Sequence, residues 1–380
     1  MIWAAAGLLA GLLGLGAIER RLRDQAHGAV PIRIHVNGTR GKSSVTRLIA
    51  AALRESGVPT LAKTTGTEAR LILPDGGEES ILRRSPPSIR EQLWVLRRAT
   101  RAGAQAVVVE CMAIDPALQR VSEHDMLRST IGVITNVRHD HGDVMGTTIE
   151  EVAIALGATL PRGGIAVLGD RPGVAVLERI ASEAGAHVVR AWDQAPMPAA
   201  VIEHRAWMRE NIATALAVTR HLGIDDEVAV RGMRLARPDP GAATTWPMRI
   251  GDRDVRLIDA TAANDPESLA TILDGRTTAH VFVFHHRADR PFRLRQFADA
   301  LPWHHPDDTV VLTGDRPDYL TRRRIRRTIG QRRSMTVSSR RLAGGIRRAL
   351  DESPLASAVV CCGNARGFSA DRLRGSIQEA

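Results

Sequence analysis

The sequence predicts an α/β protein with two domains, each built on a mostly parallel sheet. Short strands of buried type alternate with helical stretches along the 380 residues, a rhythm typical of parallel sheets covered by helices. Near residue 40, one strand runs through a glycine-rich loop into a helix. A Pro-Asp-Pro-Gly break at 238–241 leaves two lengths of chain that can each form a core.

The N-terminal segment, residues 1–24, is predicted to be a membrane anchor. Residues 2–18 are almost wholly apolar, at the short end of what a transmembrane helix needs. The basic residues follow this run instead of preceding it, unlike the order in a signal peptide. The positive-inside rule then predicts a single-pass protein of the cell membrane with a cytoplasmic body. A buried helix or a helix on the membrane surface is the alternative.

The first strand of the body leads into a loop of phosphate-binding type. Apolar and polar residues alternate over 32–36, Gly-Thr-Arg-Gly follows at 38–41, and helical spacing begins at Lys42. Backbone N–H groups at such a loop bind phosphate, while Lys42 reaches the terminal phosphates and the Ser43 hydroxyl ligates Mg²⁺. The longer Walker pattern begins with a further glycine where this chain has Val36. A plain glycine turn beside an exposed lysine is the alternative.

Two later strands end in polar side chains. One ends in Glu110, and the next runs into Asn-Val-Arg-His-Asp-His at 136–141. Ligands gather at the carboxyl ends of strands in open α/β sheets, so we expect both groups near Lys42. With no cysteine beside the histidines, Mg²⁺ is favoured over zinc. His139 or Asp140 is within reach to act as a base.

The second half repeats the α/β pattern. Polar residues follow its first strand at 259–268 and its third strand at Asp315, which suggests that this domain closes a cleft. The predicted strands cover 255–258, 280–284, 309–312 and 358–361.

Composition limits the partners. Positive charges exceed negative ones by ten, mostly through arginine, and the densest run lies at 322–327. No aromatic residue interleaves with that run, so single-stranded nucleic acid has no stacking platform and we expect no nucleic-acid partner. A solvated basic face or a membrane-surface patch is favoured, although an acidic substrate or polyanionic product would also suit the charge. The three cysteines lack metal-binding spacing and suit a reducing cytosol.

Taken in order, these motifs resemble those of the Mur-type ATP-dependent amide ligases. Within that group the chain is most similar to the CapB/PgsB family, the ligase subunits of poly-γ-glutamate synthases. The resemblance covers about residues 1–370 and is more specific in the first half. It rests on Gly38–Ser44, Lys63–Thr67, Glu110, Thr135–His141, Asp143–Gly146, Asn211, Asn264–Ser268 and Gly363-Asn364.

The resemblance implies a P-loop-containing Mur-ligase-like central domain over 25–238, a smaller Rossmann-like domain over 239–380 that closes the active site, and an N-terminal membrane helix. It also implies the site residues. ATP would be held by Gly38, Thr39, Arg40, Gly41, Lys42, Ser43 and Ser44, with Asn211 at adenine and Asp315 at ribose. Mg²⁺ would be held by Ser43, Glu110 and His141. The substrate residues would be Thr65, Gly66, Thr67, Arg138 and Ser268, and the catalytic residues Lys42, His139, Asp140, Asn264 and Asp265.

The implied reaction joins the γ-carboxylate of glutamate to an amine through an acyl phosphate, with ATP and Mg²⁺ as cofactors. The expected partners are glutamate, a growing anionic polymer, small membrane subunits of the same synthase, and further copies of the chain in a homo-oligomer. The alternatives are a folylpolyglutamate-type or peptidoglycan-tailoring ligase, a membrane-bound P-loop kinase or NTPase, and a non-catalytic assembly subunit.

Overall fold

The computed structural model forms two compact units, Met1–Asp239 and Pro240–Ala380, which we describe separately. It describes residues 2–66, 69–83, 86–194, 196, 198, 208–239, 244–250, 252–261, 263, 266–273, 277–289, 291–299, 305–329, 334–364, 368 and 370–379. Within α1, α10, α11, α12 and α14, some of these residues are described for the backbone alone.

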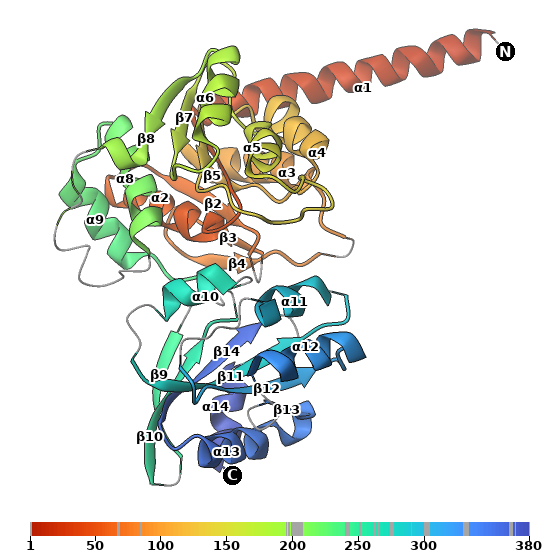
Figure 1. The fold of residues 1–380 in the computed structure, drawn as a ribbon. Helices are drawn as coiled ribbons and strands as arrows, with labels where there is room; N and C mark the ends of the chain where they lie inside the picture. The colour runs from red at the N-terminus through yellow and green to blue at the C-terminus, as the bar shows by residue number, and fades with distance from the viewer. Residues whose placement is uncertain are drawn as a thin grey trace. The chain divides into compact units, whose positions relative to one another are not determined.

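The first unit is built on an eight-stranded sheet in the order β4-β3-β2-β5-β1-β6-β7-β8 (Figure 1). The strands from β2 to β8 in this order are parallel, and the β2-β3-β4 end is antiparallel. The strands are β1 (Ile32–Asn37), β2 (Thr60–Thr64), β3 (Arg70–Ile72), β4 (Glu78–Ser80), β5 (Ala106–Glu110), β6 (Ile131–Ile134), β7 (Ile165–Leu168) and β8 (His187–Arg190).

Helices cover both faces of this sheet because its central strands are apolar on both sides. Ile34, Val36 and Val108 pack with α2, α8 and α9 on one face. Val107 and Val109 pack with α1, α3 and η1 on the other. The helices are α1 (Ile2–Ala29), α2 (Lys42–Glu55), α3 (Glu91–Arg101), α4 (Pro116–Val121), α5 (Ile149–Gly157), α6 (Val174–Glu183), α8 (Arg209–His221) and α9 (Asp226–Leu235), with the π-helix η1 (Ser122–Leu127) and the 3₁₀ turn η2 (Ala191–Asp193).

The order of the strands determines where a ligand can bind. The chain leaves β1 through α2 toward β2 and leaves β5 through α4 and η1 toward β6, so the two neighbouring strands send their connections in opposite directions. A crevice opens at the carboxyl ends of strands at such a point. Val36 pairs with Glu110, so the loop after β1 and the Glu110 carboxylate lie at the same edge.

As far as its side chains are described, helix α1 packs on the first unit near its carboxyl end. Ala26 is buried there, whereas Trp3, Leu9 and Leu13 are 89%, 59% and 66% exposed. Figure 1 shows the helix extending away from the sheet toward the N-terminus. Within the described part of the chain, no helix combines the length and hydropathy needed to cross a bilayer, so the predicted membrane helix stays a prediction.

The second unit has a six-stranded sheet in the order β13-β12-β11-β14-β10-β9, parallel except for the β9-β10 hairpin. Two apolar cores lie on its two faces. The strands are β9 (Thr244–Ile250), β10 (Arg253–Asp259), β11 (Ala279–His286), β12 (Thr309–Gly314), β13 (Ser334–Thr336) and β14 (Ala356–Gly363). The helices are α10 (Pro266–Ile272), α11 (Pro291–Asp299), α12 (Tyr319–Ile329), α13 (Leu342–Glu352) and α14 (Ala370–Glu379), with the 3₁₀ turn η5 (Ser339–Arg341). The predicted α/β class with two sheets is confirmed, and the four strands predicted here are β10, β11, β12 and β14.

Candidate functional site

The loop between β1 and α2 has a backbone that only glycine fits. Gly38 and Gly41 have φ angles of +133° and +78°. A Cβ atom on Gly38 would lie 2.0 Å from Thr135 Oγ1, and one on Gly41 would lie 2.3 Å from Asn211 Oδ1. The two glycines therefore permit both the left-handed backbone and the close approach of β6 and α8.

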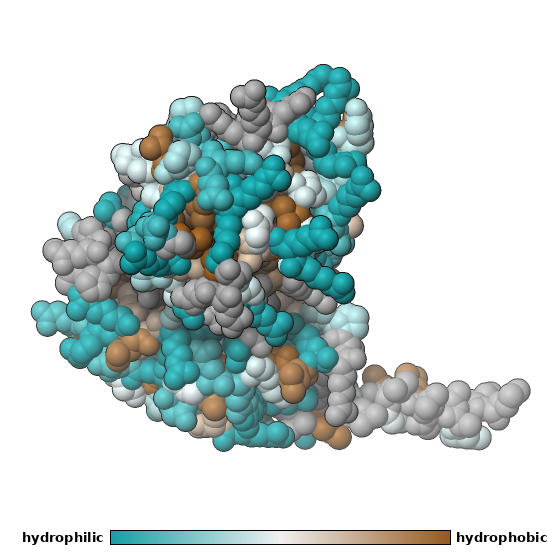
Figure 2. Space-filling model, turned by 90° about the horizontal axis from the view of Figure 1, so that it is seen from below, coloured by the Kyte–Doolittle hydropathy of each residue, from teal (hydrophilic) through white to brown (hydrophobic). Residues whose placement is uncertain are grey.

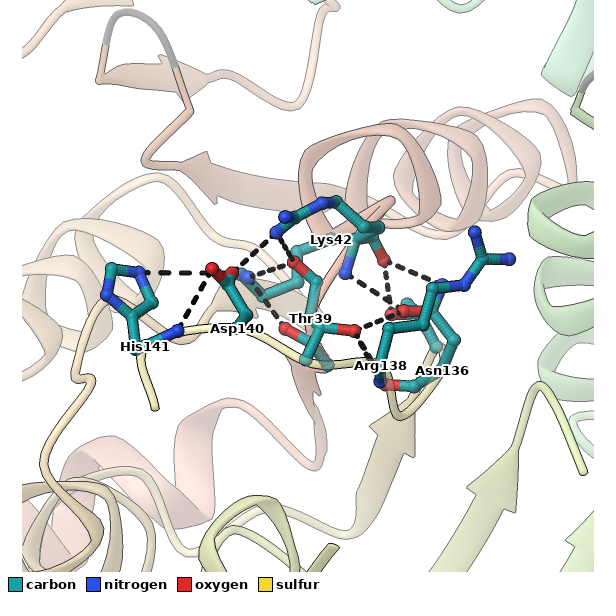
Figure 3. A network of polar contacts seen from close by, with 9 residues as sticks. Thr39, Lys42, Asn136, Arg138, Asp140 and His141 are labelled. Carbon is teal, nitrogen blue, oxygen red and sulfur yellow. Dashed lines mark hydrogen bonds and ion pairs between the residues drawn. The ribbon is translucent and has the colours of Figure 1, made fainter. Parts of the chain in front are cut away.

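Residues just after β6 hold this loop from the side. Asn136 Oδ1 accepts hydrogen bonds from Thr39 Oγ1 at 2.7 Å and from the Arg40 amide at 3.0 Å. Thr135 Oγ1 and Asn136 Nδ2 donate to the Arg40 carbonyl at 2.5 and 3.2 Å, and Thr39 Oγ1 accepts from the Arg138 amide (Figure 3). Side chains aimed at loop backbone fix its shape before any ligand arrives. The sequence placed the 136–141 group near Lys42 but predicted no role for Thr135 or Asn136 in holding the loop.

Lys42 begins α2 and folds back over the loop. Its Nζ donates to the carbonyls of Gly38 at 2.7 Å and Thr39 at 3.4 Å. Burial lowers the pKa of Lys42, and the Glu110 carboxylate opposes that change. The ammonium group is thus held above the loop between backbone oxygens and a carboxylate.

Glu110 joins the helix start to the loop after β2. One carboxylate oxygen accepts hydrogen bonds from Ser43 Oγ at 2.8 Å and from the Thr65 amide at 2.6 Å. Gly66 is also close, because a Cβ atom there would lie 2.7 Å from Ser43 Oγ. Hydroxyl and carboxylate oxygens are the donors that Mg²⁺ prefers, so this pair fits the ion.

Asp140 and His141 lie on the other side of the loop. Asp140 Oδ2 pairs with Arg40 NH1 at 2.5 Å, and Oδ1 accepts from the His141 amide at 3.1 Å. Burial raises the pKa of Asp140, but Arg40 and His141 outweigh it and the net pKa is lowered. His141 has a left-handed backbone, φ +44°, and its Nε2 lies 3.9 Å from Asp140 (Figure 3). His139 is exposed.

The predicted site residues fall into separate groups according to which of them contact one another. The contacts at the loop bring together Ser43, Glu110, Thr65 and Gly66, and separately Arg40, Asp140 and His141. Among the described residues, no group of three His, Cys, Asp or Glu side chains is placed to hold a metal. Ser44 lies in the first turn of α2.

Other predicted residues lie around or outside this loop. In the first unit, Asn211 touches the loop at Gly41, and Arg138 pairs with Glu210 at 3.1 Å. In the second unit, Asp315 follows β12 and accepts from the Ala288 amide at 2.7 Å. Thr67, Asn264 and Asp265 lie outside the described residues, and Ser268 is described only as part of the α10 backbone.

On the opposite face of the sheet, β1 carries a buried ion pair. His35 Nδ1 lies 2.8 Å from Glu123 Oε2, and the two side chains are 0% and 1% exposed. The other Glu123 oxygen accepts from the Ser129 amide and hydroxyl at 2.8 and 2.9 Å. Burial lowers the pKa of His35, but contacts with Cys111 and Glu123 raise it to about 9. The charged pair fastens β1, the strand that leads into the loop, to η1.

Each of the two units matches a known protein family. The Mur ligase middle domain matches residues 36–209, and the poly-gamma-glutamate synthase CapB C-terminal domain matches residues 245–379. The chain is 37% identical over 322 residues to the PGA synthase CapB of Bacillus subtilis (strain 168), covering 82% of each chain. It is also 37% identical over 303 residues to the capsule biosynthesis protein CapB of Bacillus anthracis, covering 77% of this chain and 65% of that one.

Solved structures share the fold at lower identity. A Mycobacterium tuberculosis folylpolyglutamate synthase complexed with ADP superposes with a TM-score of 0.69 at 18% identity, covering 97% of this chain and 98% of that one. MurF from Acinetobacter baumannii gives 0.66 at 16% identity, covering 97% and 80%. With a Mur-ligase fold, a CapB C-terminal domain and this identity to Bacillus relatives, the chain belongs to the CapB family.

Proposed function

We propose that this chain is the ligase of a poly-γ-glutamate synthase, using ATP to activate a glutamate carboxylate and join it to an amine. The observation that carries the proposal is the preformed loop at 38–44, in which Glu110 meets Ser43 and the Asn136 side chain fixes the backbone. Membership of the CapB family, whose Mur-type relatives are ATP-dependent ligases that form C–N bonds, supports the reaction class.

In the first step, an oxygen of the glutamate carboxylate attacks the γ-phosphorus of ATP, and ADP leaves. The loop amides and the positive end of α2 face the phosphates. Lys42 and Arg40 offset the negative charge that spreads over the γ-oxygens. Ser43 and Glu110 would hold Mg²⁺, which supplies further charge neutralisation when bound.

In the second step, an amine attacks the acyl carbon of the acyl phosphate, the amide bond forms, and inorganic phosphate leaves. The amine must lose a proton in this step. Asp140 is a weak proton acceptor because Arg40 and His141 lower its pKa, so it is better suited to orient Arg40. The exposed His139 is the remaining candidate for the base.

The proposal includes a site of action at the cytoplasmic side of the cell membrane, with small membrane subunits as partners. Exposed apolar side chains along α1 support an anchor, since Trp3, Leu9, Leu13 and Ile18 are all more than half exposed. Arginines at 20, 21 and 23 follow the apolar run, which favours a cytoplasmic body.

The test is glutamate-dependent ADP release by the full chain with its membrane fraction. Lys42→Ala removes a charge from the phosphate site, and we expect turnover to fall by at least about a hundredfold. Arg97→Gln, an exposed change on α3, serves as the control with unchanged turnover. Undiminished ADP release in Lys42→Ala would refute the loop assignment, and ADP release without an amide product would favour a kinase or motor.

A further inference from the structure

The second unit carries a concentration of arginine that the proposed reaction does not use. Residues 316–348 contain twelve arginines and a single acidic residue, Asp318. This segment comprises α12, β13, η5 and the start of α13. We propose that its exposed arginines form a binding surface for the polyanionic product, a chain of carboxylate-bearing residues; this inference rests on the proposed function.

Helix α12 presents arginines on its outer side. Thr321 and Ile325 are 3% and 1% exposed and pack toward the sheet. Arg323, Arg326 and Arg327 are exposed and spaced three and four residues apart, so they lie along one face of the helix. Among the described residues, no acidic side chain forms an ion pair with these three arginines.

The two acidic residues closest to this helix are already engaged. Asp299 of α11 pairs with Arg324. Asp318 caps α12 by accepting from the Thr321 amide at 2.9 Å, and it lies 3.6 Å from Arg295 NH2. These acids pair with Arg324 and Arg295, which are themselves exposed, and not with Arg323, Arg326 or Arg327.

Further arginines lie at the edge of the sheet where α12 begins. Arg316 is exposed and follows β12, and Arg340 and Arg341 are exposed and follow β13. Since β12 and β13 are parallel neighbours, residues after their ends lie at the same edge. We call Arg316, Arg323, Arg326, Arg327, Arg340 and Arg341 the arginine surface. Arg316, Arg340 and Arg341 lie at the edge that also holds Asp315, the carboxyl edge where ligands bind in parallel sheets. Helix α12 begins at that edge and carries the other three arginines away from it, with Arg326 and Arg327 in its last turn.

The chemistry of the surface favours a carboxylate polymer over other polyanions. Guanidinium groups bind carboxylates through paired hydrogen bonds, and many weak contacts along one flexible polymer add together. Single-stranded nucleic acid would need stacking platforms, and Tyr319 is the single aromatic residue in 316–348. A lipid surface would need an apolar stripe, but among the described side chains of α12 the exposed apolar ones are Tyr319 and Leu320. Figure 2 shows hydrophobic residues on the visible face only in small separate patches.

The experiment compares two matched double variants. R323Q/R327Q removes two charges from the arginine surface, and R97Q/R101Q removes two from α3. In both pairs the arginines are exposed and four residues apart on an eleven-residue helix. Binding of fluorescein-labelled poly-γ-glutamate is measured by anisotropy without ATP at several salt concentrations. We expect about a tenfold weaker affinity for R323Q/R327Q, with a shallower salt dependence, and less than a twofold change for R97Q/R101Q.

Two further probes complete the test. Oligothymidylate of equal charge and phosphatidylglycerol vesicles should show a smaller loss with R323Q/R327Q than the polymer does. Equal polymer binding by both double variants, or a larger loss for either alternative probe, would overturn the proposal. Lys42→Ala should bind the polymer like the unaltered chain, so failure of the ligase assignment and failure of the arginine surface give different results.

Discussion

The buried pair of His35 and Glu123 makes the stability of the first unit depend on pH, by an amount that follows from the structure. The pKa of His35 is about 9 in the fold, against an ordinary value of 6.5. Each unit of difference corresponds to about 1.4 kcal/mol, so protonated His35 contributes about 3 kcal/mol to the free energy of unfolding. Because the pKa is raised by folding, this contribution is complete below pH 6.5 and is lost as the pH rises to about 9.

Replacing Glu123 by glutamine tests this reasoning. The substitution keeps the shape of the side chain but removes the charge that favours protonated His35. Because Cys111 also raises the pKa of His35, the variant loses only the part due to Glu123, and below pH 6.5 we expect it to be less stable than the unaltered chain by up to about 3 kcal/mol. The difference should shrink as the pH approaches 9, because the unaltered chain loses the same contribution there.

The assay is urea denaturation of the full chain in detergent between pH 6 and 9.5. Hydrogen exchange of the peptide that contains β1 measures the stability of the first unit separately from that of the second. Glu79→Gln, which alters a half-exposed pair with Arg98, is the control and should change stability by less than about 1 kcal/mol at any pH. Equal pH dependence in the Glu123→Gln variant and the unaltered chain would show that Glu123 does not stabilise the charged form of His35.

Two further predictions concern the loop itself. Glu110→Gln weakens the oxygen pair with Ser43, so the Mg²⁺ concentration for half-maximal turnover should rise about tenfold; an unchanged metal titration would remove Glu110 from the site. Asn136→Ala removes the acceptor that holds Thr39 and the Arg40 amide, so kcat/KM for ATP should fall about tenfold to a hundredfold while KM for glutamate is unchanged. A parallel loss in both substrates, or a chain that unfolds at lower urea, would indicate a general structural role for Asn136.

Local patterns predicted the loop because its requirements are local. Two glycines with positive φ, a lysine and a hydroxyl residue lie within residues 38–43, so one short stretch of sequence specifies them. The nearness of Glu110 to Ser43 followed from a general rule about strand ends. The 2.8 Å contact between those two side chains agrees with that expectation.

Contacts between distant segments could not be predicted in the same way. Asn136 meets Thr39 across 97 residues, because β6 lies directly beside β1 in the sheet. A single sequence predicts which segments form strands but not the order of the strands in the sheet. The hydrogen bonds from Asn136 to the loop could therefore not be predicted. The structure adds that His141 has a left-handed backbone and that its Nε2 lies 3.9 Å from Asp140, while its predicted place beside Ser43 and Glu110 stays a prediction. Strand β9 was missed because Pro247 interrupts its pattern, and an edge strand tolerates proline.

The position of Asn136 limits how the loop can hold an anion. The Thr39 amide donates to the Asn136 carbonyl at 3.2 Å, and the Arg40 amide donates to its side chain. Two of the loop's amide donors are therefore already engaged by Asn136, which follows β6. A bound triphosphate would therefore accept hydrogen bonds from the amides that remain, from Gly41 through the first turn of α2. This leaves a shorter and more rigid phosphate-binding segment than a loop in which every amide points toward the ligand.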